Sequence, residues 1–76
     1  MVLAYVMVRV DAGKERDVLE KVTKWEEVKE AHIIYGEWDI IIKVEVDSIE
    51  DITSFVVDKL RTLEDVKLTS TMIVAE

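Results

Sequence analysis

The sequence lacks the residue types on which several kinds of site depend. It has no cysteine and one histidine in 76 residues. Disulfides, thiol catalysis and CxxC zinc sites are therefore excluded, and a multi-histidine metal centre within one chain is disfavoured. No nucleophile elbow, phosphate-binding loop or glutamate-rich metal motif is found either. We therefore expect no metal, no cofactor and no enzymatic activity.

Long hydrophobic runs and excess positive charge are absent too. No apolar stretch approaches the roughly 20 residues of a membrane span, and the N-terminus has no signal-peptide pattern. Lys and Arg number 10 against 17 Asp and Glu, a net charge of -7. A protein that binds the phosphate backbone needs clustered basic residues. The composition predicts a soluble, cytoplasmic domain with no direct contact with nucleic acid or membrane.

Hydrophobic residues make up 50% of the chain and charged residues 36%, and there is no proline, asparagine or glutamine. A surface built from Glu, Lys and Asp without thermolabile amides resembles that of thermophile proteins. The length allows one domain, which we expect to span residues 1–76.

Hydrophobic periodicity predicts four strands and two helices. Strands are expected at residues 2–10, 28–35, 38–46 and 66–74, and helices at 14–24 and 49–61, the first of them capped by Asp11. This βαββαβ order predicts an α+β, ferredoxin-like fold, with a four-stranded antiparallel sheet and both helices on one face. A weak repeat at an offset of 38 residues supports two equivalent halves. Lys21, Glu26, Val28 and Lys29 are identical to Lys59, Glu64, Val66 and Lys67.

The face of the sheet without helices is too apolar to remain in water. Two helices cover one face, and monomers rarely expose large contiguous apolar patches. We therefore expect a second copy to pack sheet against sheet about a twofold axis. The expected patch consists of Leu3, Tyr5, Met7, Ile41 and either Ile33 or Tyr35.

One local pattern is suited to ligand binding, the run of Gly36, Glu37, Trp38 and Asp39. Gly36 permits a positive φ, and free backbone N–H groups beside the Asp39 carboxylate suit a zwitterion. The alternative is a plain hairpin turn in which Asp39 accepts backbone N–H bonds.

The last predicted strand carries three successive hydroxyls, those of Thr69, Ser70 and Thr71. They suit a polar ligand at an interface, although threonine also favours strands for structural reasons. His32 lies alone in its strand, and we interpret it as a surface or interface residue.

Residues 28–39 (VKEAHIIYGEWD) and 66–74 (VKLTSTMIV), in this βαββαβ frame, resemble the ligand-binding domain of Lrp/AsnC transcription regulators, also called the RAM domain. The resemblance covers essentially the whole chain. It implies amino-acid effectors, dimers formed through the sheets, and assembly of dimers into rings. It further implies an effector site between subunits, with Gly36, Trp38 and Asp39 on one side and Thr69, Ser70 and Thr71 on the other.

No helix-turn-helix precedes Val2, so the resemblance implies a stand-alone RAM domain that does not bind DNA itself and acts on full-length Lrp/AsnC regulators. Tyr35 is larger than the residues frequent before this glycine, which leaves the ligand's identity open. Two alternatives remain: a small enzyme of the dimeric α+β barrel type, such as a monooxygenase, and a purely structural assembly domain.

Overall fold

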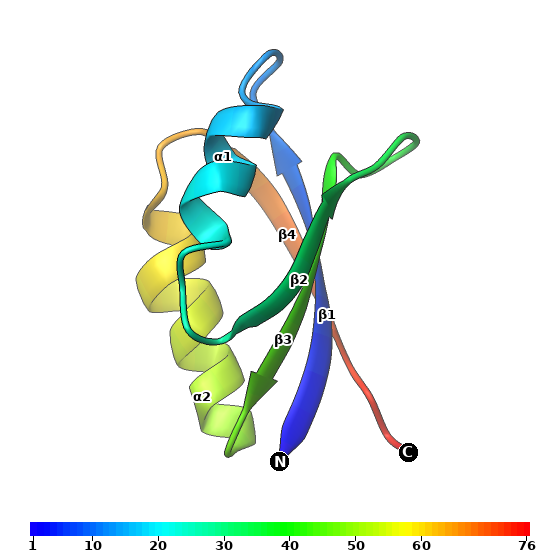
Figure 1. The fold of residues 1–76 in the computed structure, drawn as a ribbon, viewed down its shortest axis with the longest axis vertical. Helices are drawn as coiled ribbons and strands as arrows, with labels where there is room; N and C mark the ends of the chain where they lie inside the picture. Colours follow the sequence, from blue (N-terminus) through cyan, green and yellow to red (C-terminus); the bar gives the residue numbers. More distant parts are fainter.

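The strand and helix patterns of the sequence form the expected elements. The computed structural model describes residues 1–76 and places both helices on one side of a four-stranded antiparallel sheet of order β2-β3-β1-β4 (Figure 1). The ferredoxin-like fold is thus confirmed. The strands are β1 (Val2–Val10), β2 (Val28–Ile33), β3 (Ile40–Val46) and β4 (Val66–Ile73), and the helices are α1 (Glu15–Val22) and α2 (Ile49–Ser54).

One row of side chains on each central strand makes the core beneath the helices. Alternate residues of β1 and β3 are buried, as the period of two along a strand requires. Burying such an aliphatic side chain stabilises the fold by roughly 1.5–3 kcal/mol. The core residues are Ala4, Val6, Val8, Val10, Val18, Val22, Ile40, Ile42, Val44, Ile52, Phe55 and Leu60.

The second helix is not the continuous α-helix expected over residues 49–61. Ser48 caps it, its Oγ accepting the N–H of Asp51 at 3.3 Å. The α-helix ends at Ser54 and continues as a π-helical turn (Phe55–Lys59) and a 3₁₀ turn (Leu60–Thr62). A π turn adds one residue to the helical repeat, so Phe55 and Leu60, five positions apart, both face the core.

The predicted cap of α1 is wrong. Residue Lys14 occupies the N-cap position and makes no side-chain cap bond. Asp11 instead forms an ion pair with Lys67 at 3.3 Å, while its backbone carbonyl accepts the N–H of Lys14. The Asp11 carboxylate, which the local pattern assigned to the helix cap, therefore makes a tertiary contact with Lys67 of β4 instead.

The internal repeat is visible as two identical connections between helix and strand. Before β2, the N–H of Trp25 bonds the carbonyl of Val22, and the N–H of Val28 bonds the carbonyl of Trp25. Both bonds recur 38 residues later, before β4. There the N–H of Leu63 bonds the carbonyl of Leu60, and the N–H of Val66 bonds the carbonyl of Leu63. Similar sequence has produced the same pair of tight turns, and each turn begins at a buried residue, Val22 or Leu60.

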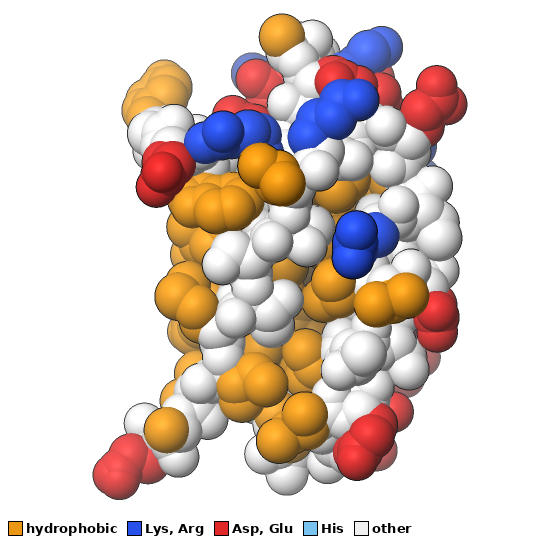
Figure 2. Space-filling model, turned by 180° about the vertical axis from the view of Figure 1, so that it is seen from behind, with side chains coloured by type: hydrophobic (Ala, Val, Ile, Leu, Met, Phe, Trp, Pro, Cys, Tyr) orange, Lys and Arg blue, Asp and Glu red, His pale blue; other side chains and the backbone are white.

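The other face of the sheet carries no helix and is apolar along its middle. The register places Leu3, Tyr5 and Met7 of β1 in one row with their neighbours from β3 and β4. Figure 2 shows hydrophobic side chains gathered along the side of the molecule that lies away from the helices. We call this surface the open face. It consists of Leu3, Tyr5, Met7, Ile41, Leu68 and Met72, the last two more than half exposed.

Ile33 does not belong to the open face, so that part of the expected patch was wrong. A register shift between Val28 and Glu30 exchanges the faces of the sheet on which the following side chains of β2 lie. Ile33 is consequently paired with Ile40 on the helix side, while His32 pairs with Ile41 on the open face. No helix of the structure has the length and apolar character needed to cross a membrane.

Candidate functional site

The connection between β2 and β3 forms a tight turn that projects beyond the rest of the sheet (Figure 1). Its base is closed by the N–H of Ile34, which bonds the carbonyl of Asp39 at 2.8 Å. Gly36 has φ +115°, a backbone conformation that L side chains rarely adopt. The glycine therefore sets the path of this turn, as the sequence predicted, but the turn also includes Trp38, which had been expected in the strand.

The N–H groups of the turn have no hydrogen-bond acceptor within the protein. None of the four successive N–H groups of Tyr35, Gly36, Glu37 and Trp38 donates to a backbone carbonyl of the protein. Successive free amides in a turn favour anions because their dipoles add. Tyr35 is fully exposed, and Trp38 is half-buried against the body of the domain.

Asp39 connects this turn to the central strand. Its Oδ2 accepts the backbone N–H of Val10 at 2.8 Å, and its own N–H donates to the carbonyl of Val8 at 2.9 Å. Val10 lies beyond the last paired residues of β1 and β3, Val8 and Ile40. The carboxylate thus satisfies a partly buried N–H that the end of β3 leaves without a partner, which is the structural role considered for this residue.

Arg9 is a residue of this site that the sequence pattern did not reveal. Its side chain reaches from the open face to the turn, where both Nε and Nη2 donate to the backbone carbonyl of Glu37, the Nε bond at 3.1 Å. The guanidinium lies 5.6 Å from the ring centroid of Trp38, within the range of a cation–π contact. The contact joins residues 28 positions apart, so only the antiparallel pairing of β1 with β3 brings them together.

The three hydroxyls of β4 lie on the other side of β1 from the turn. Thr69 is paired with Val8, Ser70 with Met7 and Thr71 with Val6. Since neighbouring strands are about 4.8 Å apart, two strand spacings put β4 about 10 Å from β3. Within one protomer the structure therefore groups Gly36, Trp38 and Asp39 but not the hydroxyls of residues 69–71.

The three β4 residues also differ in the face they occupy. Ser70 lies on the open face beside Met7, whereas Thr69 and Thr71 share the helix-side row with Val8 and Val6. Thr69 and Ser70 are half-buried and Thr71 is exposed. None of the three hydroxyls makes a hydrogen bond within the protomer, which leaves them available to a ligand or a second chain.

A polar cluster lies at the edge of the open face. Glu30 accepts from His32 at 3.3 Å and from Lys43 at 3.5 Å. The hydrogen bond from His32, and then the charge of Lys43, lower the pKa of the Glu30 carboxyl below its ordinary value. With Tyr5 and Ile41 these side chains line a shallow hollow of about 140 Å³.

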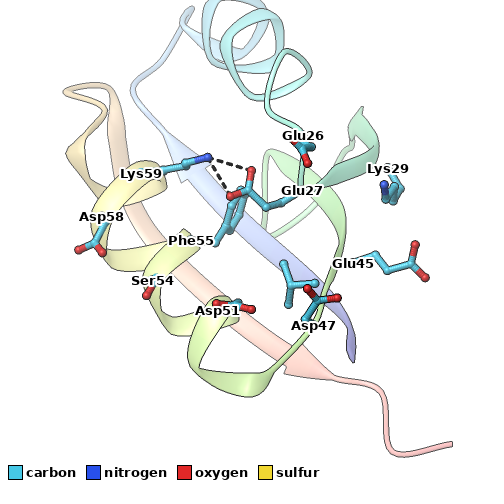
Figure 3. Close-up of a pocket in the computed structure, with 11 residues that line it drawn as sticks. Glu26, Glu27, Lys29, Glu45, Asp47, Asp51, Ser54, Phe55, Asp58 and Lys59 are labelled. Carbon is cyan, nitrogen blue, oxygen red and sulfur yellow. Dashed lines mark hydrogen bonds and ion pairs between the residues drawn. The ribbon is translucent and has the colours of Figure 1, made fainter. Parts of the chain in front are cut away.

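A second, larger groove lies elsewhere, between the α2 segment and the ends of β2 and β3 (Figure 3). It has a volume of about 470 Å³ and is strongly acidic, so it repels the carboxylate of an amino acid. Lys59 spans part of it and bonds both carboxylate oxygens of Glu27 at 2.8 and 2.9 Å. The acidic residues of this groove are Glu26, Glu27, Glu45, Asp47, Asp51 and Asp58. No group of His, Cys, Asp and Glu side chains is arranged to hold a metal ion.

The chain thus combines a ferredoxin-like sheet with an exposed turn and an apolar face that no helix covers. Comparison with known proteins identifies the family. Residues 3–76 match the model described as the Lrp/AsnC ligand binding domain, and the chain belongs to that family.

Relatives and solved structures agree with this assignment. An uncharacterized HTH-type transcriptional regulator from Pyrococcus abyssi is 38% identical over 73 residues, which cover 92% of this chain and 49% of the relative. The chain thus spans about half the length of the curated relatives it matches. The crystal structure of FFRP-DM1 is 46% identical with a TM-score of 0.94, covering 97% of this chain and 99% of that one. AsnC of E. coli is 28% identical with a TM-score of 0.93, covering 99% of this chain and 51% of that protein.

Pyrococcus is a genus of thermophiles, in agreement with the composition of this chain. The relatives are named as transcriptional regulators.

Proposed function

We propose that this chain is an amino-acid-binding and oligomerising module that modulates Lrp/AsnC-type regulators in the cytoplasm and does not itself bind DNA. The observation that carries the proposal is the turn of residues 35–38, whose four N–H groups have no backbone acceptor beside the carboxylate of Asp39. An α-amino acid offers both complementary charges. Its carboxylate binds the N–H groups, and its ammonium lies toward Asp39.

The second half of the proposed site comes from another copy of the chain. Thr69, Ser70 and Thr71 lie on β4, across β1 from the turn and about 10 Å from β3, so within one protomer they do not reach a small ligand bound at the turn. In an assembly, a neighbouring copy supplies these hydroxyls. The proposal therefore couples ligand binding to contact between protomers.

The open face supports the proposed homodimer. It presents contiguous apolar side chains on the central strands, with Leu68 and Met72 of edge strand β4 more than half exposed. A twofold axis that lies in the interface, parallel to the two sheets, pairs this surface with itself. Further contacts through the projecting β2–β3 turns would close dimers into rings. The same surface allows association with the equivalent domain of a full-length regulator, because the relatives share this fold.

The proposed absence of DNA binding rests on charge and architecture. The net charge is -7, and both helices are engaged with the sheet on one face. The enzyme alternative gains no support from the core, because no polar side chain is buried beneath the helices where a catalytic cavity would lie. A structural assembly domain without a ligand is the second candidate, favoured by the open face alone.

Thermal denaturation with each of the common amino acids tests the proposal, followed by calorimetric titration of any that act. A ligand that binds only the native state adds about 2.7 kcal/mol at a concentration 100 times its Kd. L-Methionine belongs in the panel because a transcriptional regulator from Neisseria meningitidis with this fold, 23% identical, was solved as a complex with L-Met.

One or a few amino acids should raise the melting temperature and titrate with defined stoichiometry, while the matching amino-acid amides bind more weakly. No binding by any amino acid, in a protein that still self-associates, would favour the structural candidate and contradict the proposed site.

A further inference from the structure

We infer that Arg9 positions the carboxylate-binding end of the proposed site by fixing the Glu37–Trp38 peptide. The inference rests on the proposed function for the ligand but concerns a residue that neither the sequence pattern nor the family resemblance singled out. Arg9 acts through the backbone of the turn and does not itself contact the ligand.

The contact constrains one peptide unit. Two nitrogens of Arg9 donate to the same atom, the carbonyl oxygen of Glu37, while the guanidinium lies over the ring of the next residue, Trp38. A planar guanidinium with two donors restricts the direction of its acceptor more than a single ammonium does. The orientation of the Glu37 carbonyl is therefore set by β1 and not by the turn alone.

Fixing the carbonyl also aims an N–H group. In a trans peptide the C=O and the following N–H point in opposite directions. With the carbonyl of Glu37 held by Arg9, the N–H of Trp38 points away from the guanidinium, and it donates to no backbone carbonyl of the protein. This N–H belongs to the series of free amides to which the ligand carboxylate is assigned.

The charge of Arg9 further strengthens that donor. Arg9 has no carboxylate partner within 4.0 Å, although the chain has 17 acidic residues. A cation bonded to a carbonyl polarises the peptide, so the opposite N–H becomes a better donor to an anion. Arg9 is thus expected to favour a carboxylate over a neutral group at this end of the ligand.

The experiment compares Arg9→Met, Arg9→Lys and the control Arg16→Met. Arg16 is exposed on α1 and makes no hydrogen bond or ion pair. The first readout is affinity for the bound amino acid and for its amide. Arg9→Met should weaken the acid about tenfold and the amide less than twofold, because only the acid uses the charge-assisted bond. Arg9→Lys should give an intermediate loss, and Arg16→Met no change.

The second readout needs no amino acid. The backbone amide resonance of Trp38 is followed by NMR during titration with sodium acetate, with sodium chloride at equal ionic strength as the reference. Acetate should shift this resonance in the wild type and in Arg16→Met, but not in Arg9→Met.

The two readouts separate the inference from the proposed function. Failure of every amino acid to bind, with the acetate response intact and dependent on Arg9, would contradict the proposed function and support the role of Arg9. An Arg9→Met variant with unchanged acid-to-amide preference would overturn the inference while the proposed function stands. If the wild-type protein responds neither to amino acids nor to acetate, the proposed function and the inference about Arg9 are both overturned.

Discussion

The carboxylate of Asp39 accepts the backbone N–H of Val10 at 2.8 Å, across the gap between the end of β3 and the central strand β1. The residue that the sequence marked as a ligand contact is therefore also a structural one. Its Oδ2 is occupied by the main chain, and the ammonium of a ligand would have to approach the other oxygen. Removal of the side chain therefore takes away a support of the turn as well as a charge.

Asp39→Ala should destabilise the protein by about 1–2 kcal/mol, because it leaves the partly buried N–H of Val10 without an acceptor. Asp39→Asn keeps an acceptor oxygen and should lose less than half as much. Urea denaturation measures both, with Asp47→Ala as the control because Asp47 is exposed and makes no hydrogen bond. Equal stability of the alanine and wild-type proteins would show that the bond contributes nothing in solution.

Gly36→Ala should lower stability by about 1–2 kcal/mol because of its backbone angle. A Cβ at this position would meet no atom within 4 Å, so the cost comes from φ +115° and not from a clash. Gly13→Asn is the matched control. At φ +82° it lies in a region that asparagine tolerates better, and it should cost less. The melting temperatures of the two variants test this order, and a reversed order would contradict it.

Met7→Glu should dissociate the proposed dimer. Met7 lies at the centre of the open face between Ile41 and Ser70, where a second copy would have to desolvate the new carboxylate. Val57→Glu places the same charge on the opposite side of the molecule, at a position already 49% exposed, and should leave assembly unchanged. Sedimentation velocity at micromolar concentration separates the two. A wild-type protein that sediments as a single subunit would remove the basis of the prediction.

Lys59→Met should destabilise the protein near pH 7 by about 0.2–1 kcal/mol, a modest amount because Lys59 is 43% exposed and solvent screens its pair with Glu27. The hydrogen bond from Lys59 outweighs desolvation and lowers the pKa of the Glu27 carboxyl below 4.5. A lowered carboxyl pKa stabilises the fold above the unfolded pKa, and this stabilisation disappears as the pH falls through the folded pKa.

The difference between wild type and Lys59→Met should therefore shrink towards zero below about pH 4. Lys21 is the matched control, because it occupies the equivalent place in the 38-residue repeat and has no ion pair. Chemical denaturation at several pH values measures the effect. A difference that remained constant down to pH 3 would indicate loss of the contact between the Lys59 ammonium and the Trp25 ring, 5.9 Å from its centroid, and not loss of the ion pair.

Local patterns were sufficient for most of the fold. The strand patterns of β1 and β3 and the repeat that includes Val28 and Val66 depend on neighbours in sequence, and both were confirmed by the structure. The glycine turn was also predictable, because only the backbone freedom of Gly36 permits its φ.

The features that escaped prediction depend on contacts between distant residues. The bulge in β2 moved Ile33 to the helix side, and the π turn arose where Leu60 had to reach the core. Arg9 reads as an ordinary strand residue until β1 pairs with β3 and brings it to Glu37. Whether Thr69, Ser70 and Thr71 join the turn in one site depends on a second chain, so it stays a prediction.

The position of β1 has a consequence for how the polypeptide acquires its structure. The first strand of this domain lies in the middle of the sheet, and one of its two partners is β4, the last strand of the domain. Because the earliest segment cannot complete its backbone pairing until the final one emerges, no shorter intermediate contains a finished sheet. Folding is therefore expected to be a late, all-or-none event, and truncation before Val66 would leave the central strand with an unprotected, aggregation-prone edge.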